Sequence, residues 1–417
     1  MATIRPFRGL RPRPDLAHRV ACPPYDVIGT EEARRAAVDN PFSFLNVIKP
    51  EIHARGRAGV ERAAGHFEKM LRDRILIQDP TPCLYLYELS YKELRQTGVM
   101  ALTSVAEYRG GAIKKHEHTR EAKVLDRLRL MRRLRAQTGP AFLAHPVHAP
   151  VSRWLARLRS GPPLYDFIAK DGVRHLFIRI DDGGLIDEIV NGFRQTSSLY
   201  IADGHHRTEA AARLAGYSGA DGGEESFFLS VIFPESDLHI MPYNRLVRDL
   251  NGMSPEMFLS ALSGIVRMRK NRVKAPIPVQ KGWMVLYLPG EWYDLAFDEA
   301  MGAAGPVERM DVTLLHERIL KPLLKINDPR RDARIEFIGG WECENRMIEM
   351  VDSGEYAAAF FLHPTSMLEV KQVADSGMVM PPKSTWFEPK LLSGLAVYRL
   401  PHPEPEWNLA DEQSVQF

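Results

Sequence analysis

The stretch Leu199–Arg213 constrains the fold of this chain most strongly, because it predicts a strand, a tight turn and a helix in immediate succession. Leu199–Ile201 is apolar and β-prone, Asp203-Gly204 interrupts it, and the strong helix formers of Thr208–Leu214 follow, ending at Gly216. A helix that begins at this turn directs its unpaired backbone N–H groups into the turn, where they attract anions.

Three potential cations, His205, His206 and Arg207, fall in the first turn of this predicted helix. Cations are unfavourable beside the positive end of a helix dipole, so the cluster indicates a bound anion, with phosphate the obvious candidate. A purely structural interpretation is also open, in which Asp203 is an N-cap and Gly204 supplies a positive φ. The combination of all five residues favours a site.

Composition places few limits on function. The 417 residues are 45% apolar and 26% charged, which is typical of a globular protein, and the length indicates two or three domains or one core with large additions. A net charge of +2 gives no general attraction to nucleic acid or membranes. Cys22, Cys83 and Cys343 have no metal-type spacing and form no disulfide framework. Without a signal peptide or a transmembrane run, we expect a cytoplasmic protein.

Apolar periodicity predicts irregularly mixed strands and helices, which indicates an α+β fold. We expect an extended arm at Cys22–Ile28, stiffened by two prolines and packed over the body. The predicted strands are Leu84–Leu89, Val99–Tyr108, Phe142–Val147, His175–Ile180, Phe227–Phe233, Trp283–Leu288, Arg334–Ile338, Tyr356–Leu362 and Leu395–Leu400. The predicted helices are Glu31–Val38, Val60–Leu71, Arg120–Gln137, Arg153–Arg159, Leu185–Phe193, Pro255–Val266, Asp311–Ile319, Trp341–Val351 and Met367–Ala374.

The segment Lys114–Thr119 is a second candidate for chemistry. In an extended backbone His116 and His118 would point to one side and Glu117 to the other. The spacing is not that of a zinc-binding His-Glu-x-x-His helix, although a metal site built from His116, His118, His205 and His206 is conceivable and its metal unknown. A carboxylate between two histidines is a reasonable general base. The alternative is a polar turn that Thr119 caps.

The segment Pro381–Lys390 is a third candidate. Lys383, Ser384 and Thr385 could hold a phosphate, although no glycine-rich phosphate loop is present. A proline-stiffened surface turn is the structural alternative. The chain shows no zinc-finger, helix-turn-helix or RNA-binding signature, so we expect no nucleic-acid partner.

Across Tyr200–Ala212 the chain resembles the ParB/sulfiredoxin superfamily, whose members hold nucleotide phosphates on a Gly-x-x-Arg turn before a helix. Within that superfamily, Asp203–Arg207 looks like the form found in SerK-type, ADP-dependent free serine kinases. His205 stands next to Gly204 in place of the sulfiredoxin cysteine, which disfavours a sulfinic-acid reductase.

The whole chain is also similar to a large prokaryotic family of uncharacterised function. The matching segments are Cys22–Ile28, Gly111–Arg133, the central stretch, Met241–Tyr243 with Arg245, Asp311 with Leu315, and Met380–Lys390. Together the resemblances imply an N-terminal segment (residues 1–96), a ParB/sulfiredoxin-like nucleotide-binding core (97–250) and a C-terminal α/β addition (251–417) that contributes the Pro-Pro-Lys-Ser-Thr loop.

The kinase relatives imply phosphate transfer between ADP or AMP and serine or phosphoserine, in either direction, with Mg²⁺. The resemblance and the residues together suggest that nucleotide phosphates bind Gly204, His205, His206, Arg207, Lys383, Ser384 and Thr385. Catalytic roles would fall to Glu117, as general base, with Asp203, His205 and His206. Substrate contacts would come from His116, His118 and Arg245. A nucleotide-responsive binding module and a histidine-cluster metal hydrolase are the alternatives, and the oligomeric state is open.

Overall fold

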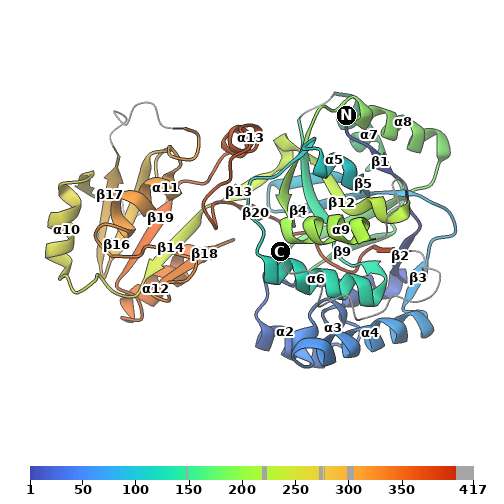
Figure 1. The fold of residues 1–417 in the computed structure, drawn as a ribbon, viewed down its shortest axis with the longest axis horizontal. Helices are drawn as coiled ribbons and strands as arrows, with labels where there is room; N and C mark the ends of the chain where they lie inside the picture. The colour runs from blue at the N-terminus through green and yellow to red at the C-terminus, as the bar shows by residue number, and fades with distance from the viewer. Residues whose placement is uncertain (147–148, 218–222, 272–275, 277, 298–304, 401–417) are drawn as a thin grey trace.

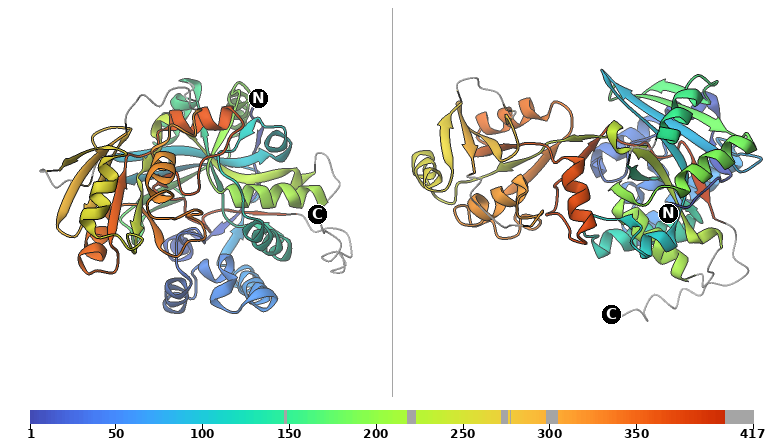
Figure 2. Two further views of the ribbon diagram at one scale, coloured as in Figure 1. Left: turned by 60° about the vertical axis from the view of Figure 1, so that its left-hand side comes forward. Right: turned by 90° about the horizontal axis from the view of Figure 1, so that it is seen from above.

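The computed structural model describes residues 1–146, 149–217, 223–271, 276, 278–297 and 305–400. The chain forms two lobes, a larger one that contains the N-terminal half and a smaller one built from the yellow and orange segments in Figure 1. Strands β13 (His239–Met241) and β20 (Trp386–Glu388) pair with each other where the chain passes between the lobes. Seen from above, α13 (Met367–Asp375) lies between the two lobes (Figure 2).

A mixed sheet organises the first lobe, with strand order β6-β11-β8-β12-β5-β4-β10-β9 and with β1 paired to β5. β11 is parallel to β6 and β12 is parallel to β8, whereas the other neighbours are antiparallel. The strands are β1 (Ile4–Arg5), β4 (Leu84–Tyr91), β5 (Leu94–Ser104), β6 (Ile113–Lys114), β8 (Ala141–His145), β9 (Tyr165–Ile168), β10 (Arg174–Ile180), β11 (Leu199–Asp203) and β12 (Phe227–Pro234).

Helices cover this sheet, and a further group of helices enlarges the lobe at one end. A group at the bottom of Figure 1 encloses its own apolar cluster, in which Phe44 meets Phe67 at a ring-centroid distance of 6.4 Å. The helices of this lobe are α1 (Ala17–Val20), α2 (Thr30–Asp39), α3 (Leu45–Ile48), α4 (Gly56–Arg72), α5 (Val105–Arg109), α6 (Glu121–Leu134), α7 (Ala149–Leu158), α8 (Gly183–Arg194) and α9 (His205–Tyr217).

The second lobe contains a sheet with strand order β15-β17-β16-β19-β14-β18. Alternate side chains enter different cores: Leu246 packs with one apolar cluster and Val247 with another. Both faces of this sheet are therefore covered. Its elements are β14 (Tyr243–Val247), α10 (Pro255–Ser263), β15 (Arg267–Lys270), β16 (Trp283–Leu288), β17 (Glu291–Ala296), α11 (Asp311–Leu315), β18 (Ile335–Gly339), α12 (Cys343–Asp352) and β19 (Ala358–Leu362).

After the second lobe the chain returns to the first. β21 (Val397–Arg399) joins β2 (Gly9–Pro12), β3 (Leu76–Gln78) and β7 (Ala136–Gln137) in a small sheet of order β3-β2-β21-β7. The second lobe is therefore an insertion between two parts of the first.

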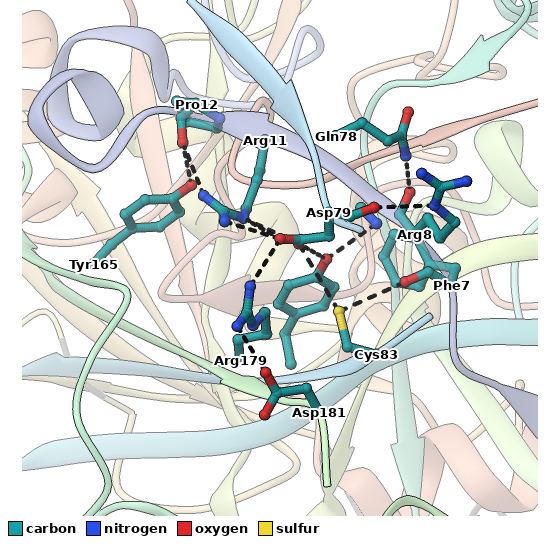
Figure 3. A network of polar contacts seen from close by, with 12 residues as sticks. Phe7, Arg8, Arg11, Pro12, Gln78, Asp79, Cys83, Tyr165, Arg179 and Asp181 are labelled. Carbon is teal, nitrogen blue, oxygen red and sulfur yellow. Dashed lines mark hydrogen bonds and ion pairs between the residues drawn. The ribbon is translucent and has the colours of Figure 1, made fainter. Parts of the chain in front are cut away.

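A buried carboxylate, Asp79, fixes β2 against the main sheet (Figure 3). Asp79 is 1% exposed and accepts hydrogen bonds from Arg11 Nε at 2.9 Å, Tyr85 Oη at 2.6 Å and Arg179 Nη1 at 3.2 Å. Although burial opposes its charge, the bonds from Arg11 and Tyr85 lower the pKa of Asp79 below its ordinary value. A buried charge is tolerated only when it is paired in this way.

The structure confirms the α+β class. Several predicted boundaries differ from the structure, among them the end of the helix expected to reach Val266, which stops at Ser263, and two further cases show the physical reason. The strand expected at Val99–Tyr108 ends at Ser104, whose side chain accepts a hydrogen bond from Glu107 N–H and caps α5. The helix expected to reach Gln137 ends at Leu134, because Arg135 adopts a left-handed φ of 49° and Ala136–Gln137 pairs as β7. Val147, placed in a predicted strand, lies outside the described residues.

The predicted boundaries between segments 1–96, 97–250 and 251–417 can be compared with the strands of the two sheets. The boundary at residue 96 falls within β5, inside the part (Leu94–Met100) that pairs with β4. The boundary at 250 follows β14, a strand of the second sheet. Within the described ranges, no helix combines the length and apolar character that a bilayer span requires.

Candidate functional site

The predicted strand, turn and helix are present as β11, Gly204 and α9. Gly204 has a φ of +92°, and a Cβ atom there would lie 3.1 Å from Arg207 Nη2 and 3.2 Å from Ala141 Cα. The turn therefore needs glycine for both its backbone conformation and its close approach to β8. Because α9 begins at His205, the N–H groups of His205, His206 and Arg207 have no preceding helical carbonyls to bond.

Two buried imidazoles face each other beside this turn. His116 is 2% and His205 is 3% exposed, and their rings meet edge to face with centroids 4.6 Å apart. Within the described part of the chain, His205 Nε2 and His116 Nδ1 are buried without a hydrogen-bond partner. Burial lowers the pKa of His116 to about 4 and holds that of His205 well below its ordinary value. Both rings are therefore neutral at pH 7.

Glu117 approaches the same imidazole pair. Its Oε2 lies 3.8 Å from His205 Nδ1, and its side chain is 41% exposed. Partial burial and the neighbouring Asp203 charge raise the pKa of the Glu117 carboxyl. Such a carboxylate takes up a proton more readily than a fully solvated one, as a general base must.

Asp203, at the end of β11, lies between two cations. Its Oδ2 is 3.6 Å from Lys390 Nζ and 3.7 Å from Arg207 Nη2, and its Oδ1 accepts a 2.8 Å hydrogen bond from Gly204 N–H. Burial opposes the charge of Asp203, but Lys390 and Arg207 outweigh it and lower the pKa of the carboxyl to about 2. The group is ionised at neutral pH.

His206 holds the start of the neighbouring helix. Its Nε2 accepts a 3.0 Å hydrogen bond from Arg120 N–H, directly before α6, and burial lowers the pKa of its ring. Of the three potential cations expected in this turn, His205 is neutral because it is buried, and burial lowers the pKa of His206. The positive charge near Asp203 comes from Arg207 and Lys390.

Arg207 lies beneath the turn. It is 7% exposed, its Nη1 donates to Pro140 O at 2.7 Å, and a cavity of about 20 Å³ adjoins it. A space of that size holds about one water molecule. These contacts fix Arg207 against the glycine turn, and its positive charge lies close to Asp203.

The Pro381–Lys390 segment reaches this site from the far end of the chain. Lys383 has a φ of +60°, and its Nζ lies 5.4 Å from the Tyr243 ring centroid. Partial desolvation opposes the charge of Lys383, but Tyr243 and Glu117 act to raise its pKa. Thr385 Oγ1 lies 3.4 Å from His116 Nε2, whereas Ser384 Oγ donates to Pro381 O at 2.6 Å within its own loop.

His118 and Arg245, both expected to contact the substrate, have different surroundings. His118 is exposed whereas His116 is buried, so the two rings do not share one environment as an extended backbone would have them. Arg245 is buried behind the Pro381–Lys383 segment and donates to Lys383 O at 2.9 Å. In the described ranges no group of three or more His, Cys, Asp or Glu side chains could hold a metal, so the four-histidine metal site does not form.

The family model described as "Protein of unknown function (DUF1015)" matches residues 4–313. The chain belongs to the DUF1015 family. No curated protein matches the DUF1015 chain significantly.

Solved structures similar to this DUF1015 member include a free serine kinase bound to AMP, a conserved hypothetical protein from Pyrococcus furiosus, and SbnI from Staphylococcus aureus with a C-terminal truncation. Their identities are 14%, 14% and 12%, and their TM-scores are 0.35, 0.35 and 0.38. The alignments cover 70%, 70% and 72% of this chain and 86%, 90% and 87% of those chains.

Two charged residues near the site of this DUF1015 chain escaped the sequence reasoning. Lys390 is one of the cations beside Asp203. Asp26 belongs to the Pro-Pro-Tyr-Asp arm, and its negative charge acts on His206, Glu117 and Lys383. The sequence feature that could have revealed Asp26 is its place directly after Tyr25 in the arm. The Tyr25 ring is buried, and the Arg127 guanidinium lies 3.9 Å from its centroid.

Proposed function

We propose that this chain is a nucleotide-dependent phosphotransferase that moves a phosphoryl group between ADP or AMP and serine or phosphoserine. The observation that carries the proposal is the pair of buried, unpartnered imidazole nitrogens on His116 and His205 at the N-terminus of α9. Buried polar atoms without partners cost free energy, which a bound ligand would recover. The unpaired N–H groups beside them make an anionic ligand the natural choice.

Serine and an adenine nucleotide are chosen as substrates because Asp203–Arg207 resembles the motif of SerK-type kinases. We extend that resemblance to the strand, turn and helix, and propose that residues around β11 and α9 form a ParB/sulfiredoxin-like core. The three free, buried cysteines are compatible with a reducing cytoplasm, where we expect the enzyme to act.

Positioning and charge neutralisation dominate phosphoryl transfer, and the groups proposed here would supply both. The α9 N–H groups and the Lys383 charge would hold the nucleotide phosphates, with Thr385 nearby. In the kinase direction the serine Oγ forms a bond to the β-phosphorus of ADP, the bond from that phosphorus to the bridging oxygen breaks, and AMP leaves. Glu117 takes the proton from the serine hydroxyl.

Magnesium fits this donor set only together with the nucleotide. Mg²⁺ is commonly held by one or two carboxylates together with substrate phosphates and water. Asp203 would hold Mg²⁺ through a bound water, which leaves Glu117 free to act as the base, and Mg²⁺ would neutralise charge on the transferred phosphoryl group.

The test is turnover in both directions. Purified chain with Mg²⁺ is incubated with serine plus ADP, and separately with phosphoserine plus AMP, and products are followed by phosphorus NMR. We expect the partner pair to form in at least one direction, with threonine a poorer acceptor than serine. No turnover in either direction by folded protein would overturn the proposal.

A further inference from the structure

A second pocket lies beside Pro381 and Pro382, and the rest of its lining comes from the second lobe. Its volume is about 340 Å³, which falls in the usual range for small-molecule sites. The Lys383 backbone carbonyl accepts from Arg245, a residue of this pocket, whereas the Lys383 charge acts on Glu117 of the first site. The pocket is lined by Arg245, Val312, His316, Leu320, Asn327, Asp328, Pro329, Arg330, Phe337, Pro381 and Pro382.

Arg245 is the strongest feature of this pocket. The residue is 4% exposed, and its Nη groups donate to the carbonyl oxygens of Tyr243, Asn244 and Lys383. Three of its five N–H bonds are used in this way, and in the described part of the chain no carboxylate lies within ion-pair distance of the guanidinium. A buried cation without a counter-ion is costly, and a bound anion would compensate it.

His316 adds an unsatisfied group. Its Nδ1 atom is buried and, across the described ranges, lacks a hydrogen-bond partner, while its Nε2 lies 3.6 Å from Glu317. The Arg245 charge is near enough to lower the pKa of His316, after the larger effect of burial and against the opposing charge of Glu317. Arg245 and His316 therefore lie close enough to contact the same ligand in this pocket.

The one carboxylate in the lining does not neutralise Arg245. Asp328 is bound by Arg330, whose Nε lies 3.0 Å from Asp328 Oδ1, and Arg331 Nε approaches its other oxygen at 3.8 Å. The lining therefore keeps an excess of positive charge. Apolar surface comes from Val312, Leu320, Phe337, Pro381 and Pro382, and the Phe337 ring centroid lies 4.5 Å from Arg245 Cζ.

We propose that this pocket binds a small organic anion, with its charged group on Arg245 and His316 and an apolar body against Phe337 and the two prolines. This site is separate from the phosphotransferase site, and its test does not use turnover. A failure of one proposal would leave the other standing. A carboxylate and a phosphate monoester are the two sources of such an anion.

The experiment titrates the full chain with benzoate, phenyl phosphate and benzamide, and measures binding by calorimetry. Benzamide has the shape of benzoate without the charge. We expect one of the two anions to bind with a Kd of about 1 mM or below. Benzamide should bind roughly tenfold more weakly, because it lacks the charge-assisted hydrogen bond. The stronger of the two anions identifies the charged group that the pocket prefers.

Variants assign the binding to this pocket. Arg245→Met should abolish anion binding, whereas Arg248→Met, on the same chain segment and outside the lining, should leave it unchanged. If Arg245→Met fails to fold, Asn327→Trp decides, because Asn327 is exposed at the lining and a bulky ring there should weaken binding. The proposal is overturned if neither anion binds, if benzamide binds as well as both anions, or if folded Arg245→Met or Asn327→Trp binds like the parent chain.

Discussion

The surroundings of Glu117 shift its pKa, and this shift affects the pH dependence of the proposed reaction. Its raised pKa, caused by partial burial and by Asp203, brings its protonation nearer to working pH. If Glu117 is the general base, the rate of the proposed transfer to serine falls as pH drops through that raised pKa, because the protonated form cannot accept a proton. Glu117→Gln should lower kcat by about 10²–10⁴-fold and remove this acidic limb. The measurement is kcat/KM against pH.

A matched control for Glu117 is available four residues later. Glu121 pairs with Arg213 at 2.6 Å on the exposed side of α6, and its loss should leave the pH profile unchanged. If Glu117→Gln retains the parent rate and acidic limb, Glu117 is not the base.

Asp79 shows how one buried charge holds distant strands. Asp79→Asn would leave Arg11 without its buried counter-ion, and breaking such a pair costs about 3–5 kcal/mol. Because the pKa of Asp79 is lowered in the folded chain, its contribution is present above the ordinary carboxyl pKa of about 4 and is lost as pH falls through the lower value. Urea unfolding at pH 7 and at lower pH measures both effects.

The comparison for Asp79 is Asp166→Asn, which removes an ion pair between Asp166 and Arg174 at 2.6 Å on the protein surface. This substitution should cost little, because exposed ion pairs contribute weakly. Equal losses in the two variants would contradict the assigned role of Asp79.

At the scale of elements, the join between β11 and α9 depends on Gly204. Gly204→Ala places a Cβ atom 3.2 Å from the backbone of Ala141 in addition to straining a φ of +92°. Gly290→Ala is a matched control, with a φ of +76° and nothing within 4 Å. We expect a destabilisation of about 1–3 kcal/mol from the strained backbone in both. Gly204→Ala should lose more, and it should also weaken nucleotide binding.

Thermal unfolding and nucleotide titration of the two glycine variants measure these effects. If Gly204→Ala unfolds at the same temperature as Gly290→Ala and binds nucleotide like the parent chain, the close approach to β8 is unimportant.

Local elements were predictable from sequence because their signals are local. The apolar run Phe227–Phe233 is β12, and the break at Asp203-Gly204 separates β11 from α9. Contacts between distant segments gave no comparable signal. The small strand Gly9–Pro12 looks like a proline-rich arm until its partners, Leu76–Gln78 and Val397–Arg399, are known.

The residues of the candidate site were predictable from their local motifs, but their meeting was not predictable from any local signal. Asp203, His205 and Glu117 lie together, and the Lys383 loop joins them across a long sequence separation. Charge state could not be foreseen, since it depends on burial: His205, counted as a potential cation, is neutral, and burial lowers the pKa of His206. Arg245 belongs to a different pocket, because β14 is part of the second sheet.

At the scale of the whole molecule, the first lobe depends on the last described residues. β21 pairs with β2 and β7 on either side. A chain that ends at Gly394 should therefore lose hydrogen-exchange protection at Gly9–Pro12 and Ala136–Gln137, while Trp283–Leu288 in the second lobe keeps its protection. A chain that ends at Leu400 is the control. Unchanged protection in the shorter chain would show that β21 is dispensable.

The insertion of the second lobe also sets an order of events during synthesis. Chains emerge from the ribosome N-terminus first, and domains generally fold as units as they appear. The strands of the second sheet lie between Tyr243 and Leu362, and β21 begins only at Val397. The second sheet is therefore complete before β21 has been made. The lobe that starts first therefore finishes last, and in a nascent chain the edges of β2 and β7 that pair with β21 stay unpaired until β21 has been made.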